Sequence, residues 1–155
     1  MEYRNLLRFK WPYLSAAEFI MLLLIPNLVG LIHIPTAWGF KIHLFQVVVF
    51  VAAIVYGPMG GLLSGLVGTI YASILMGNPY IMVGNAILGF AFGVFLRGGI
   101  PTLISAWLAF LVQMPWLVIT DYFLIGMSLP TIGLLLVALL ISDTIWALVA
   151  RAITR

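Results

Sequence analysis

Polar side chains that could bind a small molecule are rare in this sequence, and most of them stand near the ends of long apolar runs. They are amides, aromatic rings and a few ionisable groups: Trp38, Lys41, His43, Gln46, Asn78, Tyr80, Asn85, Gln113, Trp116 and Asp121. Amides beside aromatic rings can hydrogen-bond and stack on a small, planar, polar molecule. We therefore expect these residues to form a substrate-binding pocket.

The sequence lacks the motifs of common enzymes and metal sites. Gly57-Pro58-Met59-Gly60-Gly61 is glycine-rich, but no Lys-Ser or Lys-Thr follows it, as a phosphate-binding loop would require. There is no nucleophile-elbow motif and no cysteine, and Lys41-Ile42-His43 alone is a weak metal signal. We expect a protein that is not an enzyme and that holds no metal or cofactor.

Composition places these residues in a membrane protein. Hydrophobic residues make up 65% of the chain and charged residues 7%, whereas a soluble domain carries about 25% charged residues. The basic residues separate apolar runs and form no patch, so no nucleic-acid partner is expected. The sequence predicts an all-α, integral membrane fold.

Six apolar runs predict six transmembrane helices in one bundle, which forms a single membrane domain over residues 1–155. Their expected spans are about 14–34, 42–56, 60–76, 80–96, 101–122 and 129–153. About 20 residues cross the hydrocarbon core, so the second run is short. Pro26 and Pro115 predict kinks within their helices, and residues 33–39 predict a connecting loop.

Orientation follows from the positive-inside rule. With the N-terminus in the cytoplasm, six crossings return the C-terminus there. The basic residues expected inside are Arg4, Arg8, Lys10, Arg97, Arg151 and Arg155, with Lys41 outside. The candidate pocket residues then lie in the outer half of the bundle, whereas Glu18 and Asp143 lie in the inner half.

Small residues predict where helices pack closely. Gly57, Gly61 and Gly65 recur at every fourth position, and small residues at that spacing let two helix backbones approach inside a membrane. Ala147 and Ala150 could form a second face of this kind. These five positions are candidates for helix packing or for docking a partner.

Several pocket candidates have simpler explanations. Aromatic residues near span ends also form interfacial belts, which could hold Trp38, Tyr80, Trp116 and Tyr122. Lys41 could extend to the interface, and Asn85 and Gln113 could bond helices together without a ligand. Asp121 could bind substrate or pair with Lys41. The ensemble is a stronger indication of a pocket than any member.

The run from Lys41 to Arg97 resembles the substrate-binding S components of energy-coupling-factor (ECF) vitamin transporters. The matching features are the outer loop, an apolar helix, a glycine-rich fourth helix and these residues: Tyr56-Gly57-Pro58-Met59-Gly60-Gly61, Gly65, Gly68, Asn78-Pro79 and Arg97. Small size and the expected topology agree over essentially the whole chain. The Ala-x-x-x-Ala pattern that many members carry on the first helix is not present.

The resemblance implies a subunit in the plasma membrane of a prokaryote that binds a vitamin or related micronutrient from outside with high affinity. The loop between the first two helices would cap the pocket, with His33, Pro35 and Trp38 as gating residues. The partners implied are a membrane scaffold subunit and a pair of cytoplasmic ATPases. Docking would fall to the glycine face or to Ala147 and Ala150.

Two other functions stay open at this point. A stand-alone secondary carrier or channel would need coupling residues, and Glu18 and Asp143 are the candidates in the inner half. A structural or assembly subunit would bind no ligand, and its polar residues would only bond helices together. Amides with aromatic rings favour a heterocyclic substrate, whereas Lys41 with two histidines favours an acidic one.

Overall fold

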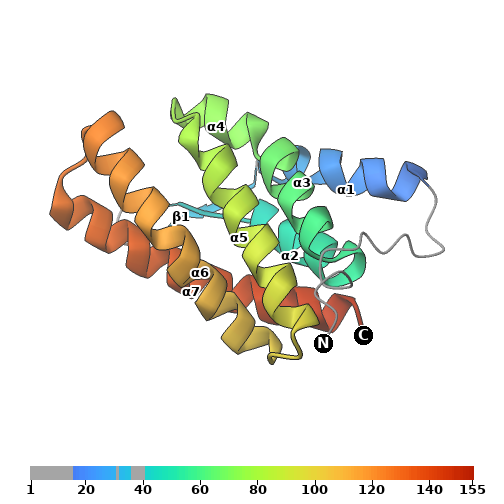
Figure 1. Ribbon diagram of the computed structural model, residues 1–155. Helices are drawn as coiled ribbons and strands as arrows, with labels where there is room; N and C mark the ends of the chain where they lie inside the picture. The colour runs from blue at the N-terminus through green and yellow to red at the C-terminus, as the bar shows by residue number, and fades with distance from the viewer. Residues whose placement is uncertain (1–15, 31, 36–40) are drawn as a thin grey trace.

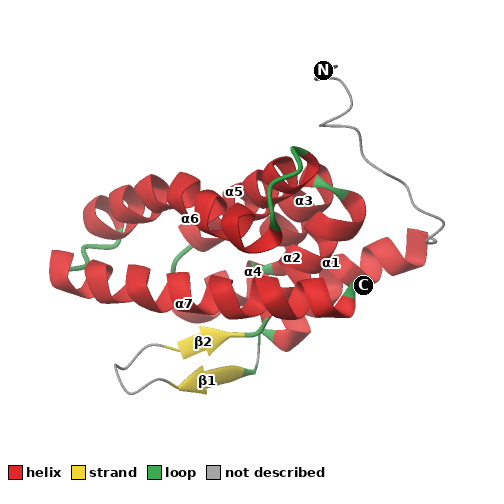
Figure 2. Ribbon diagram, turned by 90° about the horizontal axis from the view of Figure 1, so that it is seen from below, coloured by secondary structure: helices red, strands yellow, loops and turns green. Residues whose placement is uncertain are grey.

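The structure is a computed structural model that describes residues 16–30, 32–35 and 41–155. Most of the described chain is helical (Figures 1 and 2). In chain order its elements are α1 (Ala16–Val29), β1 (His33–Pro35), β2 (Lys41–His43), α2 (Phe45–Tyr56), α3 (Pro58–Gly68), α4 (Ile70–Met76), α5 (Tyr80–Arg97), α6 (Thr102–Ile119), the π-helical segment η2 (Thr120–Leu124) and α7 (Leu129–Ile153).

Four helical segments are long and apolar enough to cross a membrane. They are Pro58–Met76, Tyr80–Arg97, Thr102–Leu124 and Leu129–Ile153. They correspond to the predicted third to sixth spans, whereas α2 is a shorter apolar helix and the described part of the first span, α1, has 14 residues. The count of six crossings and their orientation stay predictions.

A short β-hairpin departs from the all-α expectation. β1 and β2 are antiparallel, with His33 opposite His43 and Pro35 opposite Lys41. The residue before a proline is disfavoured in helical conformation, so Ile34 is extended and offers an edge with which β2 pairs. The second apolar helix consequently begins at Phe45 and not at the predicted position 42.

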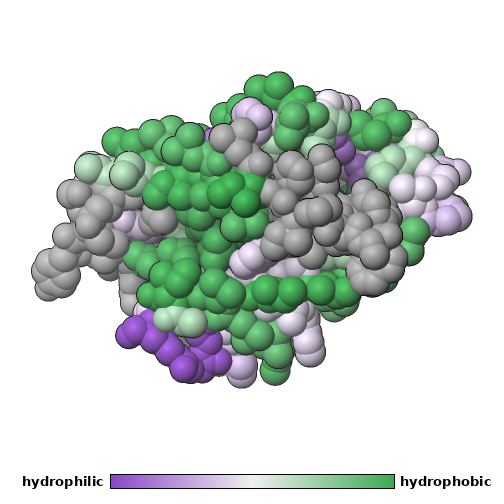
Figure 3. Space-filling view, turned by 180° about the vertical axis from the view of Figure 1, so that it is seen from behind, coloured by the Kyte–Doolittle hydropathy of each residue, from purple (hydrophilic) through white to green (hydrophobic). Residues whose placement is uncertain are grey.

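The outer surface of the bundle is apolar. Large hydrophobic side chains lie exposed on α1, α4, α6, η2 and α7, among them Ile74 (74% exposed) and Phe123 (73%). Figure 3 shows the face that lies behind in Figure 1. Hydrophobic side chains cover most of its described surface, and strongly hydrophilic ones gather at one end. Surfaces of this kind suit hydrocarbon as solvent, in agreement with the predicted membrane class.

Small and aromatic side chains form the interior. Phe50 on α2 and Phe92 on α5 are fully buried with ring centroids 4.5 Å apart. Alanines from α6 and α7 surround them, and both Ala147 and Ala150 are fully buried in this cluster. These two alanines therefore pack helices within the chain and present no surface to a second protein.

Helices α3 and α5 approach backbone to backbone through facing glycines. A Cβ on Gly61 would overlap the carbonyl of Gly89, and one on Gly65 would overlap the carbonyl of Asn85. Further along, a Cβ on Gly93 would lie 2.6 Å from the Cα of Pro58. The glycines predicted on α3 thus pack against α5, which carries a second glycine pair at positions 89 and 93. The glycine faces of both helices are therefore buried against each other within the chain.

Gly57 belongs to a different contact. It joins α2 to α3 with φ of 80°, a conformation that favours glycine. A Cβ there would collide with the guanidinium of Arg97, whose Nη2 donates a hydrogen bond to the carbonyl of Tyr56 at 3.1 Å. Arg97 thereby satisfies a carbonyl at the C-terminal end of α2.

The predicted third span is broken between α3 and α4. A side chain of α1 hydrogen-bonds to backbone groups on either side of this break. Asn27 donates from Nδ2 to the carbonyl of Val67 at 2.9 Å and accepts at Oδ1 from the N–H of Tyr71 at 2.9 Å. Pro26 occupies the space beside Gly68, where a Cβ would lie 2.6 Å from its ring. Backbone groups freed in lipid need such internal partners, so Pro26-Asn27 allows α4 to change direction.

Replacing Gly61 with alanine should destabilise the protein by about 1–3 kcal/mol, because the added methyl group must separate α3 from α5. Gly133→Ala on α7 is the matched control, since no heavy atom lies within 4 Å of a Cβ there. We expect its thermal unfolding midpoint in detergent to be unchanged or slightly raised. Equal midpoints for the two variants would contradict this account of the α3–α5 contact.

Asn27→Ala should lower the free energy of unfolding by about 1–3 kcal/mol, because it leaves backbone groups on both sides of the helix break without their partner. Leu28→Ala, at the next position and 65% exposed, should have a small effect. Thermal unfolding in one detergent compares the two variants. A larger loss for Leu28→Ala would mean that Asn27 does not stabilise the break.

Candidate binding cavity

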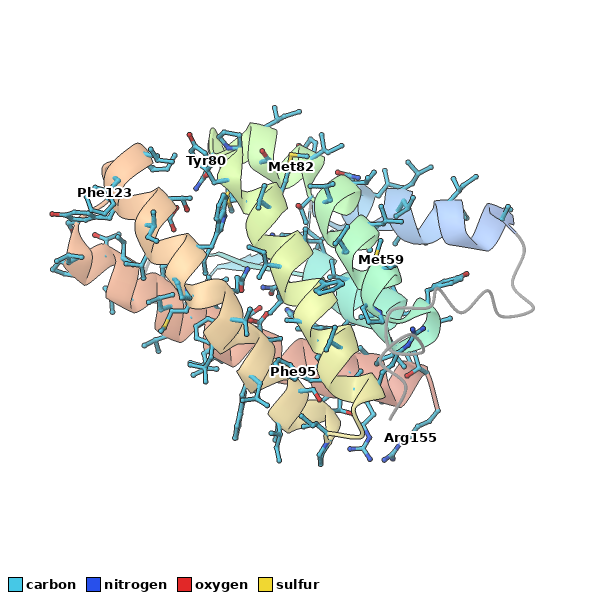
Figure 4. All side chains as sticks on the ribbon, in the orientation of Figure 1. Met59, Tyr80, Met82, Phe95, Phe123 and Arg155 are labelled. Carbon is cyan, nitrogen blue, oxygen red and sulfur yellow. The ribbon has the colours of Figure 1, made fainter. Side chains whose placement is uncertain are left out.

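A cavity of about 290 Å³ lies between α2, α4, α5, α6, η2 and α7. Its lining residues are Phe45, Gln46, Met76, Asn78, Ile81, Asn85, Gln113, Leu117, Asp121, Ile125, Met127, Leu135 and Leu139. It lies towards the end of the bundle where α4 turns into α5 and η2 leads into α7. In Figure 4 Tyr80 and Phe123 mark that end, opposite Phe95 and Arg155.

The cavity brings together five of the ten side chains that the sequence singled out for binding. They are Gln46, Asn78, Asn85, Gln113 and Asp121. Four elements and one turn carry them, from positions as far apart as 46 and 121. With Leu117 and Ile81 they form a wall that is apolar except at these polar groups, which is the usual composition of a small-molecule site.

Asn78 connects the turn after α4 to η2. Gly77 is left-handed, with φ of 63°, and Pro79 precedes α5, so the chain reverses sharply here. Asn78 Oδ1 accepts a hydrogen bond from the N–H of Tyr80 at 3.0 Å, and its Nδ2 donates to Asp121 Oδ1 at 2.9 Å. The backbone N–H can only donate, so it fixes which end of the Asn78 amide faces Asp121.

The cavity amides have hydrogen-bonding groups to spare. Gln113 is 4% exposed and makes no hydrogen bond to any residue in the described part of the chain. Asn85 donates from Nδ2 to the carbonyl of Ile81 at 2.9 Å, and Gln46 Oε1 accepts from the hydroxyl of Ser142. Asn85 Oδ1 and Gln46 Nε2 have no protein partner within the same described residues.

Tyr80 and Trp116, also predicted to bind substrate, lie beside the cavity and do not line it. Their rings meet edge to face with centroids 6.4 Å apart, and the indole Nε1 of Trp116 donates to the carbonyl of Tyr80 at 3.1 Å. The pair joins α5 to α6 next to the Asn78 turn. Its position indicates that it holds the wall of the cavity.

The predicted gating and outer-loop residues fall on the hairpin or outside the described chain. His33 and Pro35 lie on β1, and Lys41 and His43 lie on β2; the structure describes their backbone alone. Trp38 lies outside the described residues. β2 packs against α7 and leads directly into the cavity residues at the start of α2 (Figure 2).

Sequence reasoning missed the apolar lining and the π-helical turn. In a chain that is 65% hydrophobic, nothing distinguishes Met76 or Met127 from side chains that face lipid. In η2 the N–H of Ile125 bonds to the carbonyl of Thr120, and that of Met127 to the carbonyl of Asp121. This wider turn places Asp121 on the cavity wall, and π-helical turns are frequent at functional sites.

The other acidic residue with a described side chain, Asp143, lies away from the cavity. It is fully buried on α7, and neither carboxylate oxygen has a hydrogen-bond partner among the residues that the structure describes. Among the residues that the structure describes, no three His, Asp or Glu side chains come close enough to hold a metal ion together.

No family model matches the sequence, and no curated protein matches it. Comparison with solved structures finds a similar fold in the S component of a bacterial ECF transporter, with a TM-score of 0.58 over 88% of each chain and 19% sequence identity. At this identity the likeness concerns the fold. The resemblance predicted from the glycine-rich central region is thereby confirmed at that level. The chain has the fold of the S component of a bacterial ECF transporter.

Proposed function

We propose that this protein is the substrate-binding S component of an ECF-type importer. It captures a small vitamin or related micronutrient and works with a membrane scaffold subunit and a pair of ATPases. The observation that carries the proposal is the cavity in a chain of this fold, lined by five polar side chains that the sequence marks as candidates.

Gln113 is the strongest single support for a ligand. An amide inside a membrane bundle normally bonds a neighbouring helix. Gln113 bonds no described residue, although it is almost fully buried at the cavity. A substrate that completes its hydrogen bonds accounts for it, whereas a purely structural subunit would not.

The outward orientation of the cavity is part of the same proposal. Its turns lie at the end of the bundle opposite Arg155, which follows the end of α7 at Ile153 (Figure 4). Under the positive-inside rule the basic end is cytoplasmic, so six crossings would open the cavity to the outside of a prokaryotic plasma membrane. The hairpin, with His33, Pro35 and the undescribed Trp38, would act as its cap.

A stand-alone secondary carrier is the second candidate, and Asp143 is the observation that favours it. A fully buried carboxyl group without a hydrogen-bond partner is the kind of group that carries protons in transporters. Asp143 does not line the cavity, however. A carrier would need a proton route between Asp143 and the cavity.

Gln113→Ala should weaken ligand binding by about tenfold or more, because it removes hydrogen bonds that only the ligand completes. The unfolding midpoint should change little. Mass spectrometry of the small molecules that copurify with the wild-type protein identifies the ligand, and calorimetry then measures both affinities. Leu111→Ala, on the same helix but 53% exposed, should keep wild-type affinity.

Two results would contradict this role of Gln113. One is a variant that binds as tightly as the wild type. The other is a wild-type protein that carries no ligand and responds to no micronutrient, combined with strong destabilisation of Gln113→Ala. The second result would favour the structural subunit.

The isolated chain should bind substrate but not transport it. In proteoliposomes we expect uptake of the copurified compound only when scaffold and ATPase subunits are present with ATP, because the sequence contains no nucleotide-hydrolysing motif. Uptake by the chain alone under a proton gradient would contradict the proposal. If Asp143→Asn then abolished that uptake, the carrier would be established.

A further inference from the structure

The cavity also indicates the charge of its substrate. We infer that the substrate carries a cationic nitrogen group, an amine or an amidine-like edge, that pairs with Asp121. The inference rests on the proposed binding function and goes beyond it by naming the chemistry that the site selects.

Asp121 has one carboxylate oxygen committed and one open. Oδ1 accepts the hydrogen bond from Asn78 Nδ2, whose direction is set by the N–H of Tyr80. Oδ2 has no partner among the described residues, although Asp121 is 3% exposed and lines the cavity. In its ionised form this carboxylate only accepts hydrogen bonds, so a group that donates one completes Oδ2.

Nothing described around the cavity neutralises this carboxylate. The polar side chains of the lining, apart from Asp121, are the amides of Asn78, Asn85, Gln46 and Gln113, and the remaining lining residues are apolar. A buried charge is costly unless it is paired. A cationic substrate supplies the missing charge, and a charge-assisted N–H···O bond is about twice as strong as a neutral one.

The amides of the cavity offer further hydrogen-bonding groups to the same substrate. Asn85 Oδ1 is a second open acceptor, whereas Gln46 Nε2 is an open donor, because Gln46 Oε1 is bonded to Ser142. Gln113 offers one group of each kind. The substrate thus has N–H donors at its cationic edge and an acceptor elsewhere, on a body small enough for about 290 Å³.

The test uses three fragments of the same size and different charge on the full chain in detergent: benzamidine (cationic), benzamide (neutral) and benzoate (anionic). Calorimetric titration should show benzamidine binding about tenfold or more tightly than the other two. Asp121→Asn can still accept from Asn78 and should remove this preference. Asp143→Asn, which changes a buried carboxyl group away from the cavity, should keep it.

Benzoate or benzamide binding as tightly as benzamidine would overturn the inference and leave the binding function intact. That result is expected if Lys41 of β2 is the counter-ion of Asp121. A preference for benzamidine that survives Asp121→Asn would overturn it too.

If no fragment binds, the compound that copurifies with the protein decides. A cationic compound that Asp121→Asn loses supports the inference, and any other compound overturns it. A protein that binds no fragment and carries no compound overturns the inference and the proposed function together.

Discussion

The contact between α3 and α5 is the constraint on which the rest of the bundle depends. Two glycines on each helix bring the backbones together, with Gly61 against Gly89 and Gly65 against the carbonyl of Asn85. In a membrane, packing and not hydrophobicity drives helix association, so this interdigitation fixes the relative height of the two helices. Asn85 owes its place in the cavity wall to that register. The aromatic pair Phe50 and Phe92 packs α2 against α5.

The cavity lies beyond the α3–α5 contact, where α4 has taken the place of α3 in the bundle. The chain achieves this by ending α3 at Gly68 and restarting as α4, while Asn27 of α1 bonds to backbone groups on either side of the break. On the opposite wall, η2 widens the end of α6 in the same way. Irregular backbone at membrane depth is tolerated where it lines a cavity or is buried in protein. η2 meets the turn that follows α4, where Asn78 bonds Asp121.

Much of the fold and half of the candidate site followed from local chemistry. A polar side chain in an apolar run has few places to go, so Gln46, Asn85 and Gln113 could be assigned to an interior without knowledge of the helix partners. The positions of the aromatic rings could not be assigned in this way. The indole N–H of Trp116 donates to the carbonyl of Tyr80, and the ring lies beside the cavity without lining it. The break at Thr69 also escaped prediction. It depends on a hydrogen-bonding partner about 40 residues away in sequence.

The cavity occupies one end of the bundle, and the packed cluster around Phe50, Phe92 and Ala147 fills the other. Buried side chains of that cluster pack beyond the cavity, on the side away from the turns. Capture and delivery are then separate thermodynamic problems. Each tenfold gain in affinity lowers the free energy of the bound state by about 1.4 kcal/mol. A later conformational change of the protein must supply the same amount to release the molecule. A tight scavenger with this architecture therefore needs an external source of work in proportion to its success at binding.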